Sequence, residues 1–304
     1  MDFETGQFLN KIPYAKAGSG EKTIVIFPPT HHLLWNVTVD AEEQVNGYKH
    51  FIPDRFTYYI LGYDPNLPKD HTSEQIAADF AQIIREYIGP SIIMAVSFGG
   101  SVAIPFAALY PELTEKLILL VSTYGSSGEG VKLAKELIKL AEEGKTFTLQ
   151  KEINQLYSNR VLRLLFDLKT WKNWPKMERT MNPVSTFINA YNHLLETAEE
   201  RKKYLPMIQS PTLIIGGTKD QFTSEEYYRT TAELIPNAHL ELFEGKTHTV
   251  AVEKLFEIRN IIESFLEVDK EEKAIWSKIL TRTHEKLVAI KQSAKMKVLK
   301  KKSN

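Results

Sequence analysis

The stretch "SIIMAVSFGG" at residues 91–100 decides the fold class of this 304-residue chain. An apolar run typical of a buried strand stops at Ser97, and a helical pattern follows. A strand that turns directly into a helix at a serine strains the backbone, so the positions two before and two after it must be small. Ala95 and Gly99 meet that requirement. Because ligands collect at the carboxyl ends of strands in α/β sheets, the hydroxyl is expected at a site.

Apolar runs alternate with helical patterns on both sides of this stretch. The segment 72–89 predicts a helix that Thr72 or Ser73 can cap. Such alternation predicts an α/β fold whose mainly parallel sheet is covered by helices on both faces. The alternation breaks between residues 125 and 205, where an aromatic-rich helical insertion is expected. The predicted strands are 22–29, 56–63, 90–97, 115–123, 211–220 and 238–245.

Composition excludes several classes of protein. Lys plus Arg and Asp plus Glu both number 38, so net charge gives no reason to expect a nucleic-acid partner. The absence of cysteine excludes disulfides, thiolate zinc sites and cysteine nucleophiles. The N-terminal residues do not resemble a secretory signal, and no apolar run approaches ~18 residues. A cytoplasmic location is therefore predicted.

A nucleophilic serine needs a base, and the base needs an orienting carboxylate. Asp220 closes the strand "PTLIIGGTKD", and His248 follows the next strand in "FEGKTHTVAVEK". The N–H of Phe98 is expected at a helix N-terminus, where it can stabilise an oxyanion. Taken singly, Ser97 also fits a tight turn, Asp220 a helix cap and His248 a solvated loop.

In the order nucleophile, acid and histidine, the chain resembles the α/β-hydrolase superfamily over about residues 10–267. The resemblance implies a hydrolase core of 1–124 and 206–267 and a helical cap of 125–205. It also implies a catalytic triad of Ser97, Asp220 and His248, with no cofactor.

The early loop departs from the superfamily pattern. Where His-Gly is usual, this chain has "FPPTHH", and Pro28 and Pro29 have no N–H to donate. The second oxyanion donor is therefore expected from Thr30. The adjacent His31 and His32 point in different directions and have no evident third partner, so no metal site is predicted.

The predicted function is that of a carboxylesterase-like serine hydrolase acting on a small hydrophobic ester or acyl substrate. Candidate substrate-binding residues are Pro29, His31 and Trp35 in the early loop. Trp171 and Trp174 are expected to pack the cap or, as the second possibility, to contact the substrate. The alternative is a ligand-binding or regulatory protein that keeps the hydrolase fold with little turnover. The proline-rich loop motivates that alternative.

The C-terminal segment 268–304 lies outside the resemblance. From Lys270 to Asn304, ten Lys and one Arg stand against three Glu, a net charge of +8. An apolar stripe within it predicts a basic amphipathic helix. Its predicted roles are docking on the body of the protein, contact with a second subunit, or contact with an acidic surface or membrane.

Overall fold

The computed structural model describes residues 2–267, so the predicted C-terminal helix of 268–304 lies outside the described residues. Contacts divide the chain at Arg259, and the sheet, the cap and the candidate site all belong to the unit before that residue. Helix α12 (Leu255–Glu267) crosses the boundary between the units.

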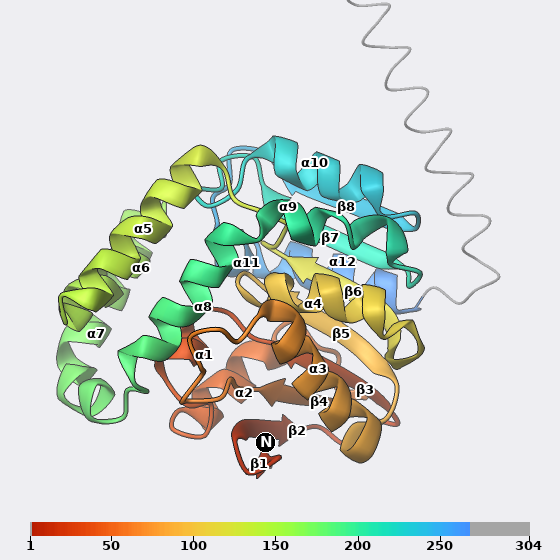
Figure 1. Ribbon diagram of the computed structural model, residues 1–304, viewed down its shortest axis with the longest axis horizontal. Helices are drawn as coiled ribbons and strands as arrows, with labels where there is room; N and C mark the ends of the chain where they lie inside the picture. Colours follow the sequence, from red (N-terminus) through yellow and green to blue (C-terminus); the bar gives the residue numbers. More distant parts are fainter. Residues whose placement is uncertain (1, 268–304) are drawn as a thin grey trace, which may run out of the picture. The chain divides into compact units, whose positions relative to one another are not determined.

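The unit is built on an eight-stranded sheet in the order β1-β2-β4-β3-β5-β6-β7-β8 (Figure 1). The six strands from β4 to β8 in that order are parallel, and the first two join antiparallel. The predicted mainly parallel sheet is therefore confirmed. The strands are β1 (Phe3–Phe8), β2 (Ile12–Ala17), β3 (Lys22–Phe27), β4 (Phe56–Leu61), β5 (Ser91–Val96), β6 (Thr114–Leu120), β7 (Thr212–Gly217) and β8 (Ala238–Phe243).

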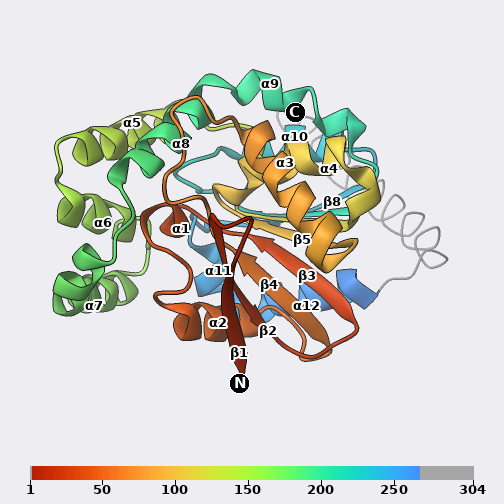
Figure 2. The ribbon, with the colours of Figure 1, turned by 60° about the horizontal axis from the view of Figure 1, so that its bottom comes forward.

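The hairpin β1–β2, seen beside N in Figure 2, is the part of the sheet that the sequence patterns did not predict. Its turn places Leu9 and Asn10 at φ of 51° and 54°. Leu9 and Asn10 are the central residues of a turn that the Lys11 N–H closes by donating to Phe8 O at 3.0 Å. Two positive φ values there suit the right-handed twist of the paired strands. Asparagine tolerates that conformation, but the turn lacks the glycine that usually marks it in a sequence.

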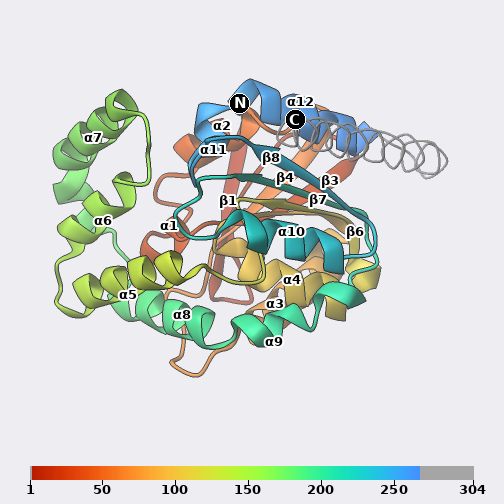
Figure 3. The same cartoon turned by 90° about the horizontal axis from the view of Figure 1, so that it is seen from above.

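Helices cover both faces of the sheet, with α3, α4 and α10 on one face and α2 on the other in Figure 3. Thr72 caps α3 in a capping box with Gln75, and the predicted helix 72–89 continues beyond α3 as a π-helical turn, Ile84–Ile88. The elements outside the insertion are α1 (His31–Leu34), α2 (Ala41–Lys49), α3 (Ser73–Ile83), α4 (Gly99–Leu109), α10 (Glu225–Leu234) and α11 (Val250–Glu253).

The predicted helical insertion between β6 and β7 is present as five helices. It is anchored to the early loop, because the Trp35 indole N–H donates to the Met177 carbonyl at 2.8 Å and the Asn182 N–H donates to the Leu34 carbonyl at 2.8 Å. These helices are α5 (Gly128–Glu142), α6 (Thr146–Asn154), α7 (Arg160–Arg179), α8 (Val184–Glu196) and α9 (Ala198–Lys202).

The exit of the insertion is held by a buried arginine. Arg201 is 1% exposed and donates to the carbonyl of Tyr124 at 2.9 Å, to the hydroxyl of Thr197 at 2.6 Å and to the carbonyl of Leu194 at 2.6 Å. Burial lowers the pKa of its guanidinium to about 10. Because a buried charge is costly without hydrogen-bond partners, these contacts fix where the cap returns to the sheet.

Candidate active site

Ser97 occupies a strained turn between β5 and α4. Its φ is 50°, a left-handed value that non-glycine residues seldom adopt. The turn is held by its own N–H, which donates to Leu120 O at 3.0 Å, and by the Ser122 hydroxyl, which donates to Ser97 O at 2.8 Å. A Cβ at Gly99 would lie 2.0 Å from Phe27 O. The chain therefore needs glycine there, as the sequence pattern predicted.

Three side chains from three loops meet beside this turn. The Ser97 hydroxyl lies 2.9 Å from Nε2 of His248, and Nδ1 of His248 lies 2.8 Å from Oδ2 of Asp220. The ring of Phe222 packs edge-on against the imidazole, with centroids 4.9 Å apart. With Nδ1–H donated to the carboxylate, Nε2 is left to accept the serine proton.

Asp220 is surrounded by hydrogen-bond donors. Tyr228 donates its hydroxyl to Oδ2 at 2.7 Å, and the N–H groups of Phe222 and Thr223 donate to Oδ1 at 2.8 and 3.2 Å. Burial alone would raise the pKa of this carboxyl, but the charge and hydrogen bond of His248 and the donors around it lower the pKa below its ordinary value. Asp220 is therefore a carboxylate at neutral pH.

The two backbone N–H groups predicted as oxyanion donors have no partner within the part of the chain that the structure describes. Within residues 2–267, the N–H groups of Phe98 and Thr30 donate to no other protein atom. Tyr191 of the cap contacts both residues, since its hydroxyl lies 2.6 Å from Thr30 Oγ1 and its ring stacks on Phe98 with centroids 5.9 Å apart. A cap residue that the sequence did not single out thus fixes the two predicted donors.

A cavity of about 610 Å³ opens beside Ser97 and His248. The predicted substrate-binding residues Pro29, His31 and Trp35 line it together with Thr30. Trp171 and Trp174, also predicted to bind substrate, are not among the lining residues. The residues that the cap contributes instead are Leu137, Gln150, Ile153, Asn154, Leu156, Tyr157, Phe166, Lys169, Thr170, Asn173, Lys176, Met177, Thr180 and Tyr191.

The helical phase of α7 explains why neither tryptophan lines the cavity. Trp174 packs edge-on against Phe147 inside the cap, with centroids 5.0 Å apart, whereas the side chain of Trp171 is 70% exposed. Phe166 and Thr170 take the positions that face the cavity. Aromatic content alone does not tell which face of a helix meets the cavity.

One wall of the cavity is polar. His31 Nε2 lies 2.9 Å from Oδ2 of Asp40, Gln44 donates to the same oxygen at 2.9 Å, and the His31 ring stacks on Trp35. The neighbouring His32 is fully buried, and desolvation, followed by the charge of His31, lowers its pKa to about 3. It is therefore neutral at neutral pH.

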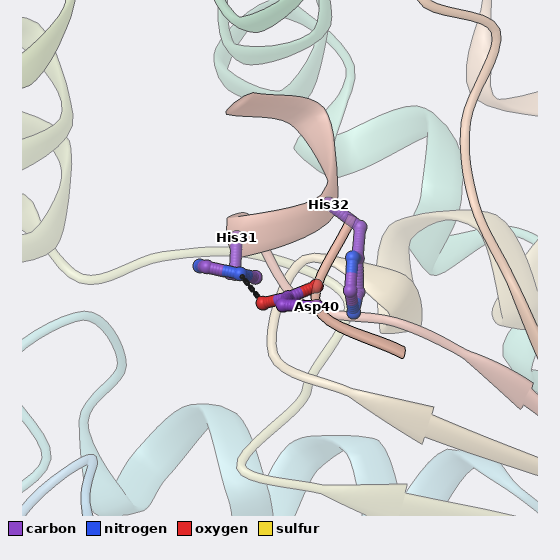
Figure 4. Close-up of side chains that lie close together, drawn as sticks. All are labelled: His31, His32 and Asp40. Atoms are coloured by element: carbon purple, nitrogen blue, oxygen red, sulfur yellow. Dashed lines mark hydrogen bonds and ion pairs between the residues drawn. The ribbon is translucent and has the colours of Figure 1, made fainter. Parts of the chain in front are cut away.

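Asp40 is the third group that the sequence did not connect with the two histidines. Each of the three residues offers a ligand atom within 4.8 Å of the others. Zinc ligands lie about 2.0–2.2 Å from the metal. In Figure 4 the carboxylate of Asp40 lies between the two imidazoles. Nε2 of His32 and Oδ1 of Asp40 are buried and form no hydrogen bond within residues 2–267. The expectation that the two histidines have no third partner was therefore wrong, because Asp40 approaches them from the following loop.

The chain shares its fold with solved α/β hydrolases. An α/β hydrolase enzyme from a Medee basin deep-sea metagenome library superposes with a TM-score of 0.68 at 18% identity, over 88% of this chain and 98% of that one. An esterase from Exiguobacterium antarcticum gives a TM-score of 0.67 at 17% identity, over 87% and 99% of the two chains. The fold and the strand-end site define a member of the α/β-hydrolase superfamily.

Within that superfamily, residues 71–255 match the family described as "Serine aminopeptidase, S33", and the chain belongs to that family. Among curated proteins it is similar to Lipase 3 of Moraxella sp., at 24% identity over 73% of this chain and 70% of that protein. It is also similar to a proline iminopeptidase of Pestalotiopsis fici, at 27% identity over 73% and 86%. The chain is thus an α/β-family hydrolase that resembles lipases and esterases.

Within residues 2–267, no helix is both long enough and apolar enough to cross a bilayer.

Proposed function

We propose that this protein is a carboxylesterase-like serine hydrolase in which Ser97, His248 and Asp220 act as a catalytic triad. The observation that carries the proposal is the continuous hydrogen-bond chain from the Ser97 hydroxyl through both ring nitrogens of His248 to a buried carboxylate. Unrelated packing residues have no reason to align in this way at a strained strand end.

In the proposed reaction, Nε2 of His248 takes the Ser97 proton while Oγ attacks the ester carbonyl carbon. The negative charge that develops on the carbonyl oxygen is stabilised by the N–H groups of Phe98 and Thr30. His248 then gives its proton to the leaving alkoxide, and the acyl group remains on Ser97. Asp220 keeps the imidazole in the required tautomer and stabilises its protonated form.

Deacylation repeats these steps with water as the nucleophile. His248 removes a proton from the water, whose oxygen attacks the acyl carbon, and the same two N–H groups stabilise the second tetrahedral intermediate. His248 returns the proton to Ser97 as the carboxylic acid leaves. No step requires a group beyond the residues of this chain and water.

The cavity supports an ester with an apolar acyl or alcohol group of moderate size. Aromatic and aliphatic side chains, among them Trp35, Leu137, Phe166 and Met177, form much of its lining, with the polar wall of His31 to one side. Lipases and esterases among the similar proteins support this substrate class. Similarity to a proline iminopeptidase makes an amide of an N-terminal residue the natural comparison substrate.

The alternative of a binding protein with little turnover rests on the missing N–H groups of Pro28 and Pro29. Two assays distinguish a serine hydrolase from a binding protein. The first is labelling with a fluorophosphonate probe, and the second is turnover of short-chain p-nitrophenyl esters and proline p-nitroanilide. The hydrolase proposal expects labelling and ester turnover in the wild type and neither in Ser97→Ala. Ser101→Ala is the matched control, because Ser101 lies in the first turn of α4, four residues after Ser97, and its hydroxyl donates to Phe98 O. A folded wild type that binds ester without labelling would favour the binding protein.

A further inference from the structure

Helix α7 of the cap carries an apolar face that no described residue covers. Five large side chains at positions i, i+3, i+4, i+7 and i+10 share this outer face, and each is more than half exposed. They are Val161 (66%), Leu164 (58%), Leu165 (56%), Leu168 (53%) and Trp171 (70%). In Figures 1 to 3, α7 lies at the edge of the cap away from the sheet.

The opposite face of α7 is apolar as well and is already used. Phe166 stacks on Tyr157 with centroids 4.4 Å apart, Thr170 is buried, and Met177 lines the cavity beside Ser97. The cap and the cavity therefore already occupy the inner face of α7, and the outer apolar side chains are left without a covering element among residues 2–267. Exposed apolar surface of this extent marks a site of interaction.

Charge distinguishes among the surfaces that can cover the outer face. Lys172 and Arg179 extend that face at four and eleven positions after Leu168, are exposed, and form no ion pair within residues 2–267. Counted over its whole length, α7 has six basic and two acidic residues, a net charge of +4. A partner that complements this face has an apolar interior that can accept the leucine and tryptophan side chains, and negative charge at its surface.

Two occupants within the protein itself are electrostatically unfavourable. A symmetric dimer through α7 would place two helices of net charge +4 against each other, because a two-fold interface pairs the same patch with itself. The segment Lys270–Asn304 has a net charge of +8 and would be repelled as well.

We propose that the outer face of α7 docks on an anionic lipid surface, with Leu164, Leu168 and Trp171 entering the acyl region and Lys172 and Arg179 meeting the headgroups. Exposed apolar side chains bordered by Lys and Arg bind a membrane interface through burial in the acyl region and attraction to anionic headgroups. Since the same helix walls the cavity, lipid-dissolved esters are brought next to Ser97. The docking itself needs no chemistry at Ser97 and stands apart from the proposed function.

Vesicle flotation with the full-length protein tests the docking. Vesicles of phosphatidylcholine mixed with phosphatidylglycerol are compared with pure phosphatidylcholine. Binding to mixed vesicles is expected in the wild type and should fall about tenfold or more in Leu164→Gln/Leu168→Gln. The matched control is Leu109→Gln/Met207→Gln, which removes 41% and 46% exposed apolar side chains outside the cap and is expected to bind like the wild type. Circular dichroism verifies that each variant is folded.

Two further readouts locate the contact. Lys172→Glu/Arg179→Glu should weaken binding to mixed vesicles and leave the weaker binding to pure phosphatidylcholine unchanged. Trp171→Phe should remove most of the blue shift in tryptophan fluorescence that accompanies binding. The proposal is overturned by equal flotation of the outer-face variant and the wild type, which would assign binding to the C-terminal segment. It is equally overturned by absence of flotation, or by a wild-type dimer that the outer-face variant abolishes.

Discussion

The strand-end site and the outer face of α7 differ in how many of their side chains have partners within the protein. At the strand ends, Asp220 accepts from His248, Tyr228 and two backbone N–H groups, and every contact is internal. On α7, large apolar side chains such as Leu165 have no internal partner of that kind. The groups of the first region bind one another, as a pre-arranged reaction site requires. The apolar side chains of the second region lack such internal contacts within residues 2–267, as a surface that binds another molecule requires.

The sharpest test of that contrast is removal of the base. His248→Ala should lower kcat/KM for a p-nitrophenyl ester by about 10⁶-fold, because the remaining catalysis, about 10³–10⁴-fold over water, comes only from binding and the oxyanion donors. Initial rates with purified protein measure it. His239→Ala is the control, since His239 pairs with Glu241 on β8 away from Ser97 and should keep full activity. Equal activity in both variants would contradict the proposed triad.

Next in size is a backbone effect. Gly99→Ala should destabilise the protein by about 3 kcal/mol or more, because its Cβ would lie 2.0 Å from Phe27 O. Gly128→Ala, at the exposed start of α5 with no atom within 4 Å, should change stability by less than about 1 kcal/mol. Urea unfolding of both variants measures the difference. Similar midpoints would show that the turn at Ser97 tolerates a shift of β3.

A smaller effect is expected from the hydroxyl of Tyr228. Tyr228→Phe removes a 2.7 Å hydrogen bond to Asp220 and should lower kcat about tenfold with little change in KM. Because that bond helps to lower the pKa of Asp220, its loss should raise that pKa, which an NMR titration of the Asp220 carboxyl measures. Tyr227→Phe, which leaves the contacts of Asp220 intact, is the control and should keep the wild-type turnover and pKa.

The same lowered pKa has a consequence for stability. The carboxylate of Asp220 stabilises the native state above the ordinary Asp pKa of about 3.9, and this contribution is lost as pH falls through the lower native pKa. Unfolding midpoints should therefore decline below about pH 4 more steeply in the wild type than in Asp220→Asn. Parallel declines would remove the link between the carboxylate and acid stability.

The smallest effect is expected at the cap, where Lys169 pairs with Glu43 across the cavity wall. Both side chains are about half exposed, so the pair contributes at most about 1 kcal/mol. Lys169→Met should change KM by two- to threefold, as measured from ester saturation curves. Added salt should reproduce part of the change in the wild type and none in the variant. A tenfold effect would make this pair part of the site.

Sequence patterns predicted the sheet well because its central strands are buried on both faces. Apolar runs such as residues 115–123 are typical of strands buried on both faces. The turn at Ser97 was predictable because its strained backbone requires small residues two positions before and after it. The β1–β2 hairpin escaped prediction because Leu9 and Asn10 adopt positive φ without glycine. Local pattern is a sufficient guide only where burial or strain restricts the residue types.

The cap was predictable as a helical insertion but not in its orientation. Because α7 is apolar on both faces, its periodicity does not distinguish the wall of a cavity from an exposed surface, so the position of Trp171 outside the cavity was not predictable. Contacts between distant segments were equally inaccessible. Asp40 beside His31 and Tyr191 beside Thr30 depend on how loops and helices meet in space.

Tyr191 limits how freely this cap can be exchanged. Its hydroxyl contacts Thr30 and its ring stacks on Phe98, so α8 contacts both of the residues that we propose as oxyanion donors. A chimera that carries the cap of a relative therefore inherits a new substrate cavity and a new support for the reacting carbonyl at once. Grafted caps should change turnover together with selectivity, unless the donor helix brings an aromatic hydroxyl to this position.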